Sequence, residues 1–176
     1  MNLEALLSPS AAKALPQRSK ERALSRLAMR QLWHAVFDPC PLLLKTASPD
    51  EWKLLEPFLE HAHARRLSMR WSLHGHLLLW LSSRGGVTAE SARELLAAAA
   101  SRWAVSDRTA AKGVLVRARA FPEFAVAGWK GRAPGEAHRA VLLRLEQADS
   151  PRESLEYALI SERDYPAAPD WTPLPA

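Results

Sequence analysis

The sequence predicts a mainly α-helical protein with a small β-hairpin, and three observations predict it. Apolar residues recur at helical spacing along most of the chain. Serine or threonine precedes several of these segments, as expected for helix N-caps. Alternation of apolar and polar residues is confined to one short stretch that ends in a glycine-bounded turn. With 176 residues, of which 48% are hydrophobic, the chain can bury one sizeable core, or one domain with a small appendage.

The N-terminal segment, residues 1–66, is predicted to be helical. Its first amphipathic helix covers residues 19–37 and stops at Asp38-Pro39-Cys40-Pro41. A short extended stretch is expected next, at residues 42–44. The first helix is expected to turn inward Leu24, Leu27, Ala28, Leu32, Ala35 and Val36.

A second helix is predicted from a capping pattern. Ser48-Pro49-Asp50-Glu51 combines an N-cap, proline at the first helical position and an acid in the first turn. Pro57 lies within this helix and is expected to kink or divide it, because proline lacks the amide hydrogen of the helical hydrogen bond.

The next three elements are also predicted to be helices. Residues 72–86 form an apolar stretch that Gly85 and Gly86 stop. Thr88 caps a helix over residues 91–103, and Ser106 caps another that starts at Asp107 and runs to about Phe121.

This last helix is expected to have one basic face. Arg108, Lys112 and Arg119 lie within about 40° of one another around the helix axis, opposite an apolar stripe. A narrow basic stripe on a core-packed helix fits the DNA major groove, where arginine and lysine reach guanine edges or phosphates. A solvated face that serves only solubility remains the alternative.

A basic turn follows the predicted helix. Residues 124–129 alternate weakly toward a strand, and Gly128-Trp129-Lys130-Gly131-Arg132 forms the turn, although no clean second strand follows. The order of helix, helix, helix and basic hairpin resembles the winged helix-turn-helix fold, within a domain of residues 67–147. The resemblance implies that the predicted helix and wing bind nucleic acid through Arg108, Thr109, Lys112, Arg119, Lys130 and Arg132.

The C-terminal part is predicted to hold two further helices, over residues 135–147 and 150–163, and a proline-rich tail. Residues 148–176 are accordingly predicted to be a third segment, although the segments 1–66, 67–147 and 148–176 could together form one globular domain. The apolar residues Val141, Leu142, Leu145, Leu155, Leu159 and Ile160 could complete the core or form a homodimer contact through residues 135–163.

Charge is unevenly distributed along the chain. Residues 102–144 carry nine Lys or Arg and three Asp or Glu, a local +6 that exceeds the +5 of the whole chain. Residues 13–30 add a further +5, whereas residues 145–176 carry −5. Concentrated basic charge indicates an anionic partner, most commonly nucleic acid.

The leading hypothesis is therefore a non-enzymatic, sequence-preferring DNA-binding protein, such as a bacterial transcriptional or replication/partition regulator. One alternative is an RNA-binding subunit of a ribonucleoprotein, in which Trp129 would stack on unpaired bases. Another is a protein-interaction adaptor whose basic faces meet an acidic partner. No cofactor is expected under any of these hypotheses.

Other chemistry has little support in the sequence. His61, His63, His74 and His76 form two His-x-His pairs, but residues i and i+2 of a helix diverge, so a zinc site is not expected. Cys40 has no histidine and carboxylate placed beside it by the sequence. No apolar run reaches membrane-spanning length and no signal peptide is evident, which predicts a cytoplasmic protein without membrane contact.

Overall fold

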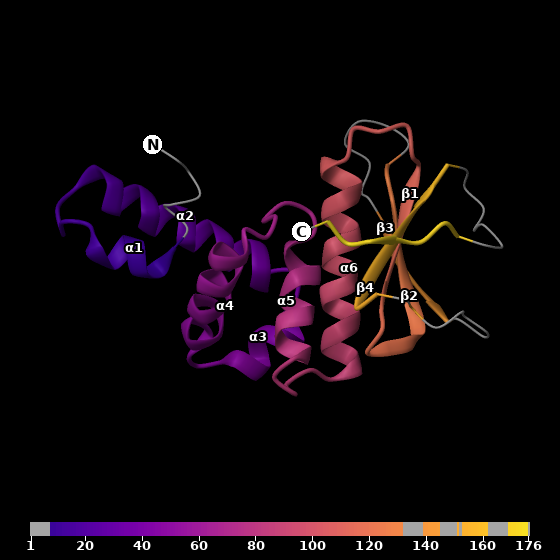
Figure 1. Ribbon diagram of the computed structural model, residues 1–176, viewed down its shortest axis with the longest axis horizontal. Coiled ribbons are helices and arrows are strands. Elements are labelled where there is room, and N and C mark those ends of the chain that lie inside the picture. The colour runs from indigo at the N-terminus through magenta and orange to yellow at the C-terminus, as the bar shows by residue number, and fades with distance from the viewer. Residues whose placement is uncertain (1–7, 132–138, 145–150, 152, 162–168, 176) are drawn as a thin grey trace. The chain divides into compact units, whose positions relative to one another are not determined.

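The computed structural model describes residues 8–131, 139–144, 151, 153–161 and 169–175 (Figure 1). The chain divides into two compact units, Met1–Leu67 and Ser68–Ala176. Each unit is considered by itself below.

The described part of the first unit is helical, as the sequence predicts. Ser19 caps α2 by accepting a hydrogen bond from the Arg22 amide at 3.1 Å, and Ser8 caps α1 in the same way. Glu60 accepts a hydrogen bond from Ser8 and another from the Ser10 amide, which joins α1 to α4. The helices are α1 (Pro9–Ala14), α2 (Lys20–Phe37), α3 (Pro41–Ala47) and α4 (Glu51–Arg65).

Three details of the first unit differ from the prediction. Residues 42–44 belong to α3, because Pro41 occupies a first-turn position in which its missing amide hydrogen costs nothing. α4 has Asp50, and not Ser48, at its N-cap position, and Pro57 lies inside this helix. The buried face of α2 is also rotated from the expected one: Leu24 and Leu27 are exposed, whereas Ser25, Met29 and Phe37 are buried. Val36 is buried as predicted.

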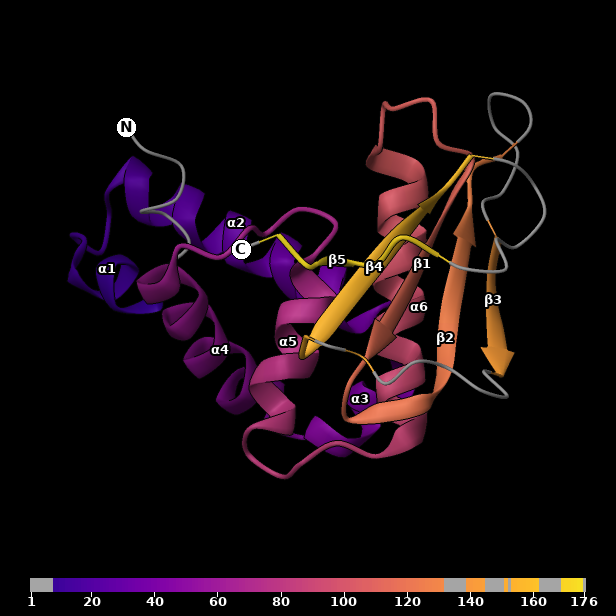
Figure 2. The same cartoon turned by 45° about the vertical axis from the view of Figure 1, so that its right-hand side comes forward.

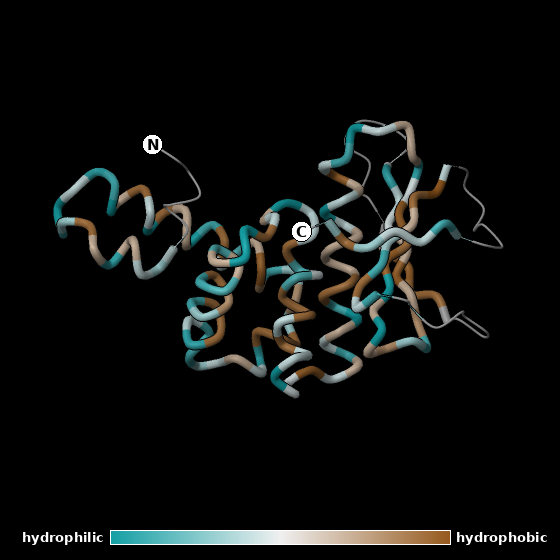
Figure 3. Tube along the Cα trace, viewed as in Figure 1, coloured by the Kyte–Doolittle hydropathy of each residue, from teal (hydrophilic) through white to brown (hydrophobic). Residues whose placement is uncertain are grey.

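Two helices of the second unit confirm the prediction. The first is α5 (Leu73–Ser82), which is mostly apolar (Figure 3), and Gly85 follows it in a left-handed conformation at φ 73°. The second is α6 (Ala89–Ser106), whose N-cap Thr88 accepts a hydrogen bond from the Ser91 amide at 3.2 Å. These two helices pack against each other, and α6 lies along the sheet (Figure 2).

The rest of the described second unit is an antiparallel five-stranded sheet in the order β3-β2-β1-β4-β5. β1 is central and pairs with both β2 and β4 over its whole length. The strands are β1 (Gly113–Ala118), β2 (Phe121–Trp129), β3 (Arg139–Arg144), β4 (Leu155–Ile160) and β5 (Thr172–Pro173).

The predicted recognition helix from Asp107 to Phe121 is wrong. Ser106 is the last residue of α6 and its hydroxyl donates to the Arg102 carbonyl, so it does not cap a new helix. Residues 113–118 form the central strand, and every one of them is buried. Because both faces of this strand are covered, no period-two alternation marks it in the sequence.

The predicted C-terminal helices are also wrong. Residues 139–144 form β3 and residues 155–160 form β4, whereas their apolar residues predict helices. The fold is therefore not mainly α with a small wing, because the sheet is a full second layer that α6 covers on one face.

The two faces of the sheet have different neighbours. Gly128 faces α6, where its backbone approaches Ala100 closely enough that a built Cβ would lie 2.5 Å from the Ala100 carbonyl oxygen. Side chains directly opposite each other in paired strands share a face, so Leu142, which is opposite Val126, lies on the α6 side as well. The other face carries a buried apolar cluster of Leu115, Ala127, Ala158 and Ile160.

Candidate functional site

The residues predicted to contact nucleic acid do not share one helix face. Arg108 and Thr109 are exposed in the link between α6 and β1, and Lys112 is exposed just before β1. Arg119 lies in the turn between β1 and β2. Arg132 lies outside the described residues.

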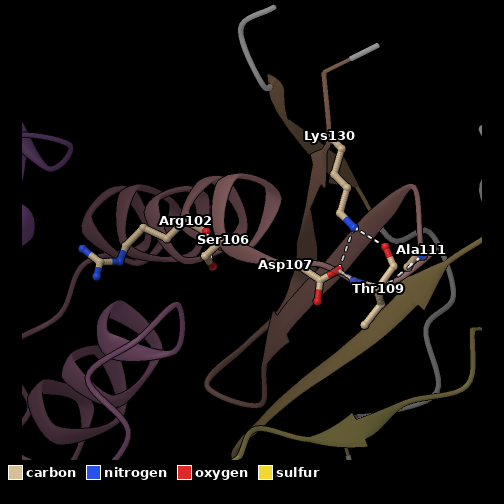
Figure 4. A network of polar contacts seen from close by, with 6 residues as sticks. All are labelled: Arg102, Ser106, Asp107, Thr109, Ala111 and Lys130. Carbon is tan, nitrogen blue, oxygen red and sulfur yellow. Dashed lines mark hydrogen bonds and ion pairs between the residues drawn. The ribbon is translucent and has the colours of Figure 1, made fainter. Parts of the chain in front are cut away.

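Lys130 is engaged in a local polar network (Figure 4). Its ammonium donates to Asp107 Oδ2 at 2.7 Å and to the Thr109 carbonyl at 2.7 Å, and it lies 5.0 Å from the Trp103 ring centroid. Asp107 Oδ2 also accepts from the Thr109 amide at 2.9 Å and from its hydroxyl at 2.6 Å. The network ties the link after α6 to the end of β2. The neighbouring Trp129 packs partly buried against the cluster on the outer sheet face.

The network lowers the pKa of Asp107 below its ordinary value of 3.8. Burial acts in the opposite direction and raises it, but the hydrogen bonds from Lys130 and Thr109 and the charge of Lys130 outweigh burial. The ionised carboxylate is therefore favoured by folding.

We expect Asp107→Asn to lower the free energy of unfolding by about 1–2 kcal/mol at neutral pH, because charge-assisted hydrogen bonds are lost. Since the pKa is lower in the folded state, the wild-type advantage is full above 3.8 and fades as the pH falls through the lowered pKa. Urea unfolding of both proteins between neutral pH and the acid limit measures this. A difference that stays constant throughout would contradict the assignment.

β3 is an edge strand of the sheet that the structure describes. Among the described strands it has β2 as its one neighbour. In an antiparallel ladder alternate residues direct their N–H and C=O groups away from the paired strand. The six residues of β3 include neither proline nor glycine, so its outward row of donors and acceptors is complete.

Apolar side chains flank this edge on both sides of the sheet. Leu142 lies on the α6 side and is 45% exposed. Val141 and Leu143 lie on the other side, half-buried, and Leu143 packs against the outer cluster. An added strand would therefore meet apolar contacts at successive residues, one side after the other.

At the opposite edge of the described sheet, the short strand β5 pairs with part of β4. Pro173 lies in β5 and Pro175 follows it, so this margin is poor in amide donors. Prolines at an edge are a common protection against further pairing. The two edges of the sheet thus differ in what they offer to an incoming chain.

The sequence did contain a signal for β3. The run Arg-Ala-Val-Leu-Leu-Arg is six residues long, is free of turn formers and holds three consecutive large apolar residues. A run of that length fits a strand better than a helix, but it lies within the helix predicted over residues 135–147.

Metal and nucleophile candidates do not assemble in the described part of the chain. There, no group of three or more His, Cys, Asp or Glu is placed to hold a metal ion. His74 and His76 are buried in α5, and Cys40 is buried at the start of α3.

In its described residues, the second unit is thus a two-layer α/β domain in which α6 covers one face of the sheet and β3 lies at one edge. The chain belongs to the MbnC-like family: the model of this family, described as methanobactin biosynthesis cassette protein MbnC-like, matches residues 12–175. No curated protein matches the chain.

The family match corrects the functional hypothesis. A biosynthesis cassette family replaces the winged helix resemblance, so the hypothesis of a DNA-binding regulator is wrong, and so is the expectation of a nucleic-acid partner. The physical reason is local, because the basic residues that suggested a groove-binding face are distributed over a link and a turn. No helix in the described ranges has both the length and the apolarity to cross a membrane.

Proposed function

We propose that this chain is a non-catalytic peptide-binding subunit of a biosynthetic system, and that it holds an extended peptide as an additional strand on β3. The single observation that carries the proposal is the edge strand, with its complete outward row of backbone groups and apolar residues on both sides. Membership of a biosynthesis cassette family favours a peptide or protein partner over nucleic acid.

The geometry also suggests which peptides would bind. Main-chain hydrogen bonds hold any extended segment, whereas side-chain contacts select among segments. Successive residues of the bound strand would face Leu142 on one side and Val141 or Leu143 on the other. The preferred ligand is therefore a proline-free segment with apolar residues on both faces. Such recognition presents a peptide without changing it, which is why we assign binding rather than catalysis.

The proposal is tested with fluorescein-labelled peptides of about 10 residues, a typical upper strand length, that tile the other products of the same gene cassette. Anisotropy titration against the full chain is repeated with Leu142→Asp, which introduces a charge beside the edge. We expect at least one peptide to bind, and its affinity to fall by about 10-fold or more in the variant, equivalent to about 1.4 kcal/mol.

Leu159→Asp is the matched control. Leu159 is the same residue type with the same exposure of 45%, but it lies on β4 at the other side of the central strand. We expect this variant to bind like wild type. Equal losses in both variants, or no binding by any peptide, would refute the proposal. If light scattering showed that β3 pairs two copies of the chain instead, the peptide assignment would also be wrong.

A further inference from the structure

Within the last described residues of the chain, 169–175, the two-residue strand β5 lies beside β4 (Figure 2). β5 pairs with β4 at two positions only, Thr172 with Tyr157 and Pro173 with Glu156. The Leu174 amide adds one hydrogen bond to the Leu155 carbonyl at 3.1 Å. So short a ladder contributes little by itself, because each backbone hydrogen bond has a net value of about 1 kcal/mol.

Trp171 supplies a stronger attachment. The Arg117 guanidinium lies 3.8 Å from the centroid of the Trp171 ring. Arg117 is itself held by Glu156, with Nε donating to Oε2 at 2.8 Å, and the two side chains are only 4% and 3% exposed. A desolvated cation–π contact of this kind is worth about 2 kcal/mol. The ring also packs against the outer apolar cluster.

Leu174 supplies a second anchor. A Cβ built on Gly75 would lie 2.9 Å from Leu174 Cδ2 and 2.6 Å from Leu155 Cδ2. The absence of a side chain at Gly75 in α5 therefore leaves the room that Leu174 occupies. The segment binds as peptide ligands do, with a few main-chain hydrogen bonds and side-chain anchors two to three residues apart.

We propose that residues 169–175 act as a tethered peptide ligand that reversibly caps the β4 edge, with Trp171 as its main anchor. The site beneath it, formed by Arg117, the β4 edge and the space beside Gly75, accepts the same segment in trans once the cap is released. This inference concerns the edge opposite β3 and does not depend on what binds there.

The covalent attachment of residues 169–175 to the chain sets the equilibrium between the capped form and the form that is open to a second copy of the segment. A ligand that belongs to the same chain as its site has an effective concentration on the order of millimolar, so a free copy of the segment at micromolar concentration competes poorly. Weakening the anchor of the attached copy shifts the balance, because the free copy retains its tryptophan.

The experiment titrates a labelled peptide of residues 169–175 into three full-length proteins: wild type, Trp171→Ala and Trp52→Ala. Trp52 is a matched control, since it is also a tryptophan but lies in α4 of the first unit and is 39% exposed. We expect Trp171→Ala to bind the peptide at least about 10-fold more tightly than the other two proteins. The same peptide with alanine in place of its tryptophan should not bind. Equal binding by all three proteins, or none by Trp171→Ala, would overturn the proposal.

Hydrogen exchange provides a test that does not need this variant to fold. In wild type, the Leu174 amide should exchange faster than the Val126 amide in the middle of β2, since a reversible cap opens without global unfolding. Trp171→Leu, which keeps apolar volume but removes the ring, should accelerate Leu174 by about 10-fold and leave Val126 unchanged. If Leu174 exchanges only as fast as Val126 in wild type, the segment is a fixed part of the sheet and the proposal is wrong.

Discussion

Glu156→Gln is expected to lower the free energy of unfolding by about 3–5 kcal/mol, because it leaves a buried guanidinium without its counter-charge. Glu156 and Arg117 occupy directly opposed positions on β4 and β1, and the closest contact between them is 2.6 Å. The second carboxylate oxygen, Oε1, accepts from the Glu153 amide at 3.0 Å, so the substitution also disturbs the entry to β4. Urea or guanidinium unfolding monitored by circular dichroism measures the loss.

Two further variants identify the cause of this loss. Replacing both partners with apolar residues, Arg117→Met with Glu156→Leu, should recover part of the stability, since neither charge then remains buried, although the contact of Arg117 with the Trp171 ring is also lost. Lys53→Met, which removes an ion pair whose side chains are 79% and 57% exposed, should cost no more than about 1 kcal/mol. If the double variant is as unstable as Glu156→Gln, burial of an unpaired charge is not the reason.

Gly128→Ala is expected to destabilise the protein by about 3 kcal/mol, at the upper end of the usual cost of overpacking. The added Cβ would lie 2.5 Å from the carbonyl oxygen and 2.9 Å from the Cβ of Ala100. Ala100 belongs to the middle of α6, so relief requires the helix and the sheet to separate. Thermal unfolding would show a lower melting temperature.

Gly86→Ala is the matched control for this substitution. No atom lies within 4 Å of a Cβ built on Gly86, which lies in the exposed link between α5 and α6. Its melting temperature should be close to that of wild type. Equal effects of the two substitutions would show that backbone freedom, and not contact with α6, is what position 128 requires.

The close approach at Gly128 also bears on the proposed peptide site. Gly128 pairs with Ala140 of β3, so the helix–sheet contact and the edge strand meet in the same part of β2. A rigid β2 holds the backbone of β3 in a regular extended form, and a regular edge is what an added strand requires. Gly128→Ala should therefore lower both the free energy of unfolding and the affinity of β3 for a peptide.

The helices were predictable where their signals are local. Ser19 and Thr88 cap α2 and α6 through their own side chains, and glycines follow α5. Such signals act within a few residues, so they can be recognised without knowledge of the rest of the fold. The rotation of α2 about its axis was not predictable in this way, because it depends on what the helix packs against.

The candidate site was largely unpredictable from sequence. A helix would align Arg108, Lys112 and Arg119 on one face, but residues 113–118 form a strand, so these three side chains are not aligned. The segment does carry an excess of basic residues, but the Lys130 ammonium is paired with Asp107, 23 residues earlier in the chain. Helical propensity determines secondary structure only weakly, and here strand pairing on both sides of β1 outweighs it.

The sequence by itself determined the number of charges, the start of α2, α5 and α6, and the apolar segments available for a core. Only the tertiary structure decided that β1, β3 and β4 are strands, that Arg117 meets Glu156 across 39 residues, and that β3 lies at the edge of the described sheet. The physical reason is that a helix forms its backbone hydrogen bonds with its own residues, whereas a strand obtains them from segments far away in the chain.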